Sequence, residues 1–117
     1  MTLIDEVRAG ELFSPDRLAR ALCASKAELA AMAGLSRDAV SKTARIRQRS
    51  TQTRIREVTE ILNRATAWAG SILAAYAWYR SEPLAGFGGL TAMQLVRDGR
   101  AADVMDYIDA VDAGVDA

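Results

Sequence analysis

The 117-residue sequence contains no histidine, one cysteine and two prolines, and it has no long hydrophobic run. Histidine is the commonest general base and the commonest metal ligand in proteins, so its absence argues against an enzyme and a metal site. The single cysteine, Cys23, excludes an internal disulfide and fits a reducing cytoplasm. Because Cys23 lies in an apolar helical pattern, we expect its thiol to be buried.

Signals of export, membrane insertion and nucleotide chemistry are also missing. The start, Met1-Thr-Leu-Ile-Asp-Glu, lacks the basic region and long apolar stretch of a signal peptide. No apolar run approaches the roughly 18 residues that indicate a membrane span, and no Gly-rich phosphate loop is present. We therefore expect a cytoplasmic protein that binds no membrane, uses no cofactor and is not an enzyme.

A formal net charge of zero hides a strong asymmetry along the chain. Residues 36–64 carry eight basic and three acidic groups, whereas residues 65–117 carry three basic and seven acidic groups. Such a separation of charge suggests two different partners, and the basic middle favours a polyanion. A solvated helix face is the alternative interpretation of the basic residues.

The periodic signals are helical, and no segment alternates as a strand does. Ser25 and Glu28 have the spacing of a capping box that opens a short helix, which Gly34 can end. Ser36 caps a further helix, predicted over residues 37–46. Thr91 and Gln94 form a second capping-box candidate.

A longer apolar seam runs from Ile55 to Tyr79 at alternating steps of three and four residues. It predicts a long helix over about residues 52–80, with a possible bend at Gly70. The seam suits a partner helix as well as the protein's own core. Because it is long for one small core, we predict a homodimer through part of this helix or through the adjacent N-terminal half. The last helix carries a row of aspartates, Asp103, Asp106, Asp109 and Asp112.

Residues 26–42 resemble the helix-turn-helix of Xre/Cro-type regulators. Small Ala30 lets two helices cross closely, Gly34 supplies the turn, and Val40 anchors the second helix to the core. An ordinary helical hairpin is the alternative. In the resemblance, residues 37–46 are the recognition helix. The candidate DNA contacts are Arg37, Ser41, Lys42 and Arg45 for bases or phosphates, and Arg47, Arg49 and Arg54 for phosphates.

The C-terminal residues 78–115 look like the toxin-binding domain of the MbcA/ParS/Xre antitoxin family. The matching features are Trp78 near a helix end, Pro83-Leu84, and the run Leu95-Val96-Arg97-Asp98-Gly99. One departure is Ala92, where the family usually has proline; alanine keeps the helix but loses the preset φ angle.

This resemblance implies an all-α protein in which a helix-turn-helix region, residues 1–60, is joined by the long helix to a toxin-binding domain, residues 61–117. It implies a type II antitoxin that silences a RES-type toxin acting on NAD or transferring ADP-ribose. It also implies binding to operator DNA, as a homodimer within a hetero-oligomer. The candidate toxin contacts are Trp78, Tyr79, Arg97, Asp98, Tyr107, Val111, Gly114, Val115, Asp116 and Ala117. For Trp78 and Tyr79, aromatic residues of this kind more often belong to a core than to an interface. The alternative function is a stand-alone regulator whose C-terminal half dimerises or senses a ligand.

The segment after Ile108 is predicted to block the toxin's NAD-binding cleft, because a small hydrophobic residue flanked by carboxylates can fill a nucleotide cleft. Truncation after Asp112 should leave toxin binding through residues 78–105 in place, while NAD consumption by the complex returns. Full inhibition by the truncated chain, at matched occupancy of the toxin, would show that the tail is not the blocking element.

Overall fold

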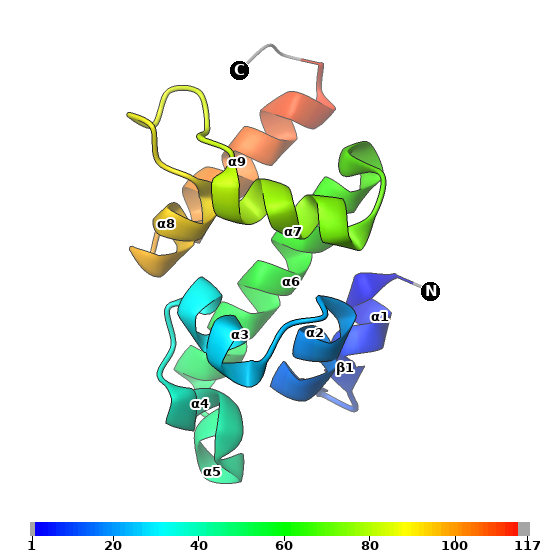
Figure 1. Cartoon of the computed structure of the whole chain (residues 1–117), viewed down its shortest axis with the longest axis vertical. Helices are drawn as coiled ribbons and strands as arrows, with labels where there is room; N and C mark the ends of the chain where they lie inside the picture. Colours follow the sequence, from blue (N-terminus) through cyan, green and yellow to red (C-terminus); the bar gives the residue numbers. More distant parts are fainter. Residues whose placement is uncertain (1, 115–117) are drawn as a thin grey trace.

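Helix α6 (Arg49–Ala69) forms the centre of the computed structural model of the chain, which describes residues 2–114 (Figure 1). Its apolar residues recur at steps of three and four and share an inward face, on which Ile55, Val58 and Leu62 are fully buried. Helices α1 and α5 from the N-terminal half pack on α6, and so do α7 and α9 from the C-terminal half. Both halves therefore contribute to one hydrophobic core.

Residues 2–114 form nine helices and one two-stranded sheet, which confirms the all-α prediction. The first elements are α1 (Leu3–Val7), β1 (Arg8–Ala9), β2 (Leu12–Phe13) and α2 (Pro15–Ala21). No helix within residues 2–114 combines the length and the apolar character needed to cross a membrane.

The antiparallel hairpin of β1 and β2 was not predicted from the sequence, because its stabilisation is long-range. The Phe13 N–H donates to Oε1 of Gln52 on α6 over 2.8 Å, and Gln52 Nε2 donates to the Phe13 carbonyl over 3.0 Å. The side-chain amide thus takes the place of a neighbouring strand and satisfies the free edge of β2. Gln52 Nε2 also donates to the carbonyl of Ile46, over 2.8 Å.

The three next helices are α3 (Lys26–Ala33), α4 (Arg37–Ser41) and α5 (Thr43–Ile46). The predicted capping box of Ser25 and Glu28 is confirmed, with both hydrogen bonds at 3.0 Å. Gly34 ends α3 in the left-handed conformation, at φ 68°, as its position predicted.

The prediction of one helix over residues 37–46 is wrong, because Lys42 adopts an extended conformation between α4 and α5. The two helices have different anchors. Ala39 and Val40 hold α4 in the core, whereas α5 has no buried residue and is tied to α6 through the Ile46 carbonyl. The second anchor is a tertiary contact, and a local helical pattern does not reveal it.

The expectation for Cys23 is also wrong, because its thiol is exposed. Helix α2 ends at Ala21, Leu22 fills the core, and Cys23 turns outward at a left-handed φ of 54°. The helical pattern that placed Cys23 inward extends beyond the real end of the helix.

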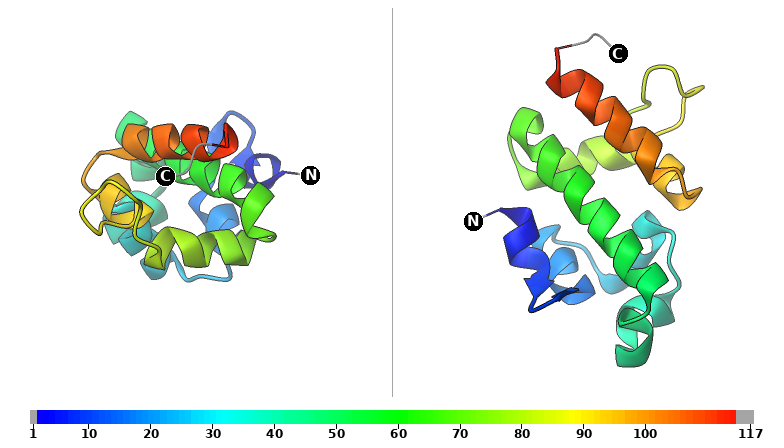
Figure 2. Two further views of the ribbon diagram at one scale, coloured as in Figure 1. Left: turned by 90° about the horizontal axis from the view of Figure 1, so that it is seen from above. Right: turned by 180° about the vertical axis from the view of Figure 1, so that it is seen from behind.

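The long helix predicted over about residues 52–80 is two helices, α6 and α7 (Ile72–Ser81). Gly70 ends α6 at a left-handed φ of 99°, and the Ser71 hydroxyl caps α7 by accepting from the Ala74 N–H. The chain reverses here, and α7 packs back against α6 (Figure 2). The two parts of the seam therefore face each other inside one protomer.

The last helices are α8 (Ala92–Arg97) and α9 (Ala101–Asp112). The predicted capping box of Thr91 and Gln94 is present at the start of α8. The aspartate row on α9 is partly neutralised within the protein: Arg64 of α6 reaches Asp109 at 2.7 Å and Asp112 at 2.6 Å. Hydrogen bonds to these two carboxylates raise the pKa of Arg64 above its usual value.

The Gln52 contacts can be tested with Gln52→Ala. Alanine suits a helix interior better than glutamine, so a loss of stability would come from the Phe13 and Ile46 groups left without a partner. We expect the free energy of unfolding in urea to fall by about 1–3 kcal/mol. The control is Gln48→Ala, at the exposed residue before α6, whose side chain makes no capping bond. Equal stability of the two variants would contradict this role of Gln52.

Candidate DNA-binding and toxin-binding surfaces

The basic segment forms an exposed surface over α4, α5 and the start of α6, at the lower end of the molecule in Figure 1. Two short helices, α3 and α4, are joined by residues 34–36, and both Ala30 and Val40 are buried between elements, as the pattern predicted. Six of the seven candidate DNA contacts are exposed: Arg37, Ser41, Lys42, Arg45, Arg47 and Arg49. Of these six, Lys42 has an acidic partner within residues 2–114, at 3.5 Å from Asp38.

Arg54 is not part of that free basic surface. Its Nη1 donates to the carbonyl of Ala33, the last residue of α3, over 2.7 Å, and its Nε lies 3.5 Å from Glu57. The side chain is largely covered, and its guanidinium is committed to satisfying a helix terminus. Arg54 is thus a structural residue of this fold.

Tyr79 of α7, like Arg54 of α6, donates a hydrogen bond to a carbonyl at the end of α3. Its hydroxyl donates to the Met32 carbonyl over 2.8 Å, and the whole residue is buried. Burial raises the pKa of Tyr79 well above its usual value, so the hydroxyl remains a hydrogen-bond donor. Tyr79 is therefore a core residue and presents no surface to a partner.

The turn after α3 also touches α8. A Cβ atom at Gly34 would lie 3.0 Å from Arg54 Nη1 and 3.1 Å from both Cα and Cγ of Arg97. Only a residue without a side chain allows this approach, and the left-handed φ of Gly34 adds a second reason for glycine. The turn that positions α4 thus rests directly on the C-terminal part of the chain.

The other candidate toxin contacts within residues 2–114 are distributed over α7, α8 and α9 and the residues that follow α8 and α9. Trp78 of α7 is half-buried, Arg97 and Asp98 are exposed at the end of α8, and Tyr107 and Val111 are half-buried on α9. Gly114 is exposed after α9. The remaining three candidates, Val115, Asp116 and Ala117, lie outside the described residues.

Two exposed apolar side chains were missed by the sequence analysis. Trp68 near the end of α6 is 38% exposed, and Leu73 near the start of α7 is 50% exposed. The Trp68 ring stands edge-on to the Trp78 ring, with centroids 4.9 Å apart. The signal was available, because Trp68 and Leu73 each lie one position away from the seam residues Ala69 and Ile72.

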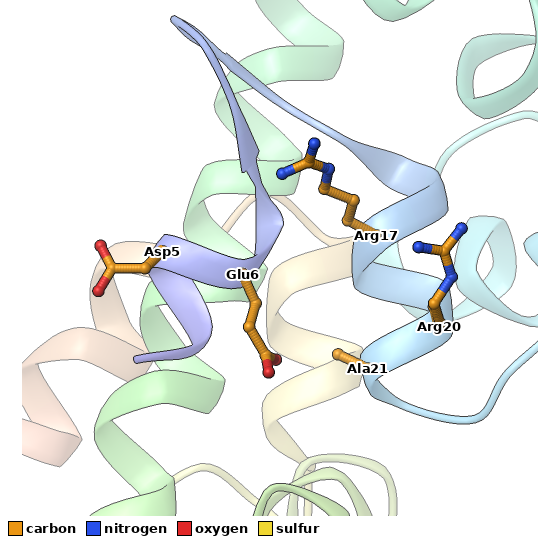
Figure 3. Close-up of a pocket in the computed structure, with 5 residues that line it drawn as sticks. All are labelled: Asp5, Glu6, Arg17, Arg20 and Ala21. Atoms are coloured by element: carbon orange, nitrogen blue, oxygen red, sulfur yellow. The ribbon is translucent and has the colours of Figure 1, made fainter. Parts of the chain in front are cut away.

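The hollows in the described surface are open and do not bring together catalytic groups. In one, of about 480 Å³, Asp5 and Glu6 of α1 lie across from Arg17 and Arg20 of α2 (Figure 3). Arg17 is held there by a 2.8 Å bond from Nη1 to the Arg8 carbonyl. Residues 2–114 contain no group of three or more acidic or cysteine side chains arranged to hold a metal ion.

The fold thus carries a basic surface over α4, α5 and the start of α6, an exposed Trp68 near the end of α6, and exposed aspartates on α9. Residues 64–114 match the family model of the antitoxin Xre/MbcA/ParS C-terminal toxin-binding domain. The match runs from the last turns of α6 through α7, α8 and α9. No curated protein and no solved structure matches the chain. The match to a toxin-binding domain supports an antitoxin role, with a protein toxin as partner.

Removing the Tyr79 hydroxyl tests the link between α7 and α3. In Tyr79→Phe the ring still fills the core, but the buried Met32 carbonyl loses its donor, so we expect a loss of about 1–3 kcal/mol in the free energy of unfolding. The matched control is Tyr107→Phe, because the Tyr107 hydroxyl makes no hydrogen bond within residues 2–114 and its removal should change little. A Tyr79→Phe variant as stable as wild type would mean that the Met32 bond contributes nothing to folding.

Proposed function

We propose that the chain is the antitoxin of a type II toxin–antitoxin pair that neutralises a RES-type toxin and represses its own promoter by binding operator DNA. The observation that carries the proposal is the match of residues 64–114 to a toxin-binding domain. The RES type of the toxin, and its action on NAD or on an ADP-ribose acceptor, follow from the family resemblance of residues 78–115.

The DNA-binding part of the proposal is supported by charge and exposure. The six exposed candidates gather on α4, α5 and the start of α6, where a phosphate backbone would meet several guanidinium groups. Since α4 ends at Ser41, Arg37 and Ser41 are the candidates on the helix after the turn, and Arg45 approaches from α5. A single small module binds DNA weakly at cellular salt, so specific recognition calls for a dimer on a repeated site.

The arrangement of the two surfaces suits simultaneous binding of both partners. The basic residues of α4 and α5 and the end of α9 lie at opposite ends of the molecule, whose longest extent is 42 Å (Figure 1). A toxin bound towards the α9 end therefore leaves the basic surface open to DNA. The proposed toxin contacts are now Trp78, Arg97, Asp98, Tyr107, Val111 and Gly114, together with Val115, Asp116 and Ala117 on sequence grounds.

Neutralisation is tested by co-expressing the chain with the protein encoded by the adjacent reading frame. We expect a complex that survives purification, and cells whose NAD level and growth are protected by the chain. A neighbouring protein that neither binds the chain nor becomes toxic without it would contradict the antitoxin role.

Operator binding is tested with single alanine variants on the promoter fragment. Lys42→Ala and Arg45→Ala should each weaken specific binding by about 1–3 kcal/mol if they contact bases. Arg49→Ala should weaken all sequences alike and reduce the salt dependence, the slope of log K against log salt, by about one. The control is Arg20→Ala, which removes an exposed basic side chain from α2, away from the basic surface. The absence of salt-sensitive binding, with and without toxin, would rule out the DNA-binding role.

A further inference from the structure

The outer face of α7 carries apolar side chains with nothing packed over them in the described structure. Leu73, Ala74 and Ala77 are exposed, and Ala77 follows Ala74 by three residues and Leu73 by four, which places the three residues on one side of the helix. Trp78 lies at the border of this face and meets Trp68 of α6 edge-on. We call these five residues, Trp68, Leu73, Ala74, Ala77 and Trp78, the α7 patch.

The α7 patch stands on a rigid support. Its two helices are joined by Gly70 and Ser71 alone, and the Ser71 side chain caps α7 over 3.0 Å. On the opposite face of α7, Ala75 and Tyr79 are buried in the core. The backbone that carries the α7 patch is therefore held in place before any partner arrives, which reduces the entropy lost on binding.

We infer that the partner toxin docks on the α7 patch, with Trp68 and Leu73 as its central contacts; this inference rests on the proposed antitoxin role. Trp68 and Leu73 are the exposed large hydrophobic residues of the described chain, and both lie inside the segment matched to a toxin-binding domain. The other exposed residues of that segment are alanines, glycines, one proline and polar or charged residues. Tryptophan is enriched among the residues that contribute most to binding at protein–protein interfaces.

The chemistry of the α7 patch favours a protein over DNA. Its five side chains are apolar, and the nearest basic residue on α7, Arg80, has its guanidinium 4.2 Å from the centre of the Tyr76 ring. A second copy of the chain is also disfavoured. A standard interface buries roughly 800 Å² on each partner, and two copies of so small a patch would need further apolar surface, which the other exposed residues of this segment do not offer. A toxin can bury the remaining interface area by contacting the alanine, polar and charged residues of α8 and α9 around the patch.

The test uses Leu73→Glu in the full chain, with the protein encoded by the adjacent reading frame as the probe. Leu73 is half-exposed, so a glutamate stays solvated in the free protein and loses hydration only when the toxin covers it. The control is Ala27→Glu, which adds the same charge at an exposed residue of α3 outside the matched segment. We expect the toxin Kd to rise at least about 10-fold for Leu73→Glu and to stay within about twofold for Ala27→Glu, with unchanged DNA binding in both.

A second measurement does not depend on a substitution. Trp68 and Trp78 are the two tryptophans of the sequence, so labelling the chain with 5-fluorotryptophan gives two ¹⁹F resonances, both from the α7 patch. We expect unlabelled toxin to shift both resonances, and operator DNA to leave both unchanged.

The outcomes separate the two proposals. If the wild-type chain binds the toxin but neither Leu73→Glu nor the ¹⁹F spectrum responds, the antitoxin role stands and the α7 patch is not the docking surface. If the wild-type chain does not bind the toxin at all, both proposals fail. If Leu73→Glu instead converts a dimer to a monomer in light scattering without toxin, the patch is an interface between copies of this chain, and the inference is overturned.

Discussion

The last carbonyl groups of α3 are the point at which the two halves of the molecule are joined. Tyr79 from α7 donates to the Met32 carbonyl, and Arg54 from α6 donates to that of Ala33. These carbonyls have no partner within their own helix, and leaving them unpaired away from water would be costly. The end of α3, from which the Gly34 turn leads to α4, is therefore attached to both α6 and α7. The predicted boundary between residues 60 and 61 falls inside α6, which both halves share.

Gly70 decides which surface the apolar seam packs against. A strict alternation of three and four residues can pack against a second chain or against the same chain, because the physical requirement, an apolar strip that leaves water, is identical. The left-handed φ of Gly70 and the Ser71 cap reverse the chain, so the strip on α6 meets the strip on α7. The residues next to the strip, Trp68 and Leu73, are then turned towards the surface. The exposure of Trp68 and Leu73 is therefore a consequence of the reversal of the chain between α6 and α7, and not of the seam itself.

Charge separates the two proposed partners in space as well as in sequence. The basic residues of α4 and α5 remain exposed, apart from the contact of Lys42 with Asp38. On α9, by contrast, Arg64 pairs with Asp109 and Asp112 and ties the helix to α6. Two carboxylates of the acidic row therefore attach α9 to α6, while most of the basic residues of α4 and α5 are available to a polyanion.

Local chemistry alone determined much of this protein. The all-α class, the capping boxes at Ser25 and Thr91, and the left-handed end of α3 at Gly34 follow from short-range backbone hydrogen bonding, which a few neighbouring residues specify. The family of residues 64–114 was also evident in the sequence. Contacts between distant residues decided the rest: the hairpin bound by Gln52, the break at Lys42, and the burial of Tyr79 and Arg54 beneath the α3–α4 turn. A sequence pattern records which side chains are apolar or charged, whereas only the packed chain decides which of them remain exposed to a partner.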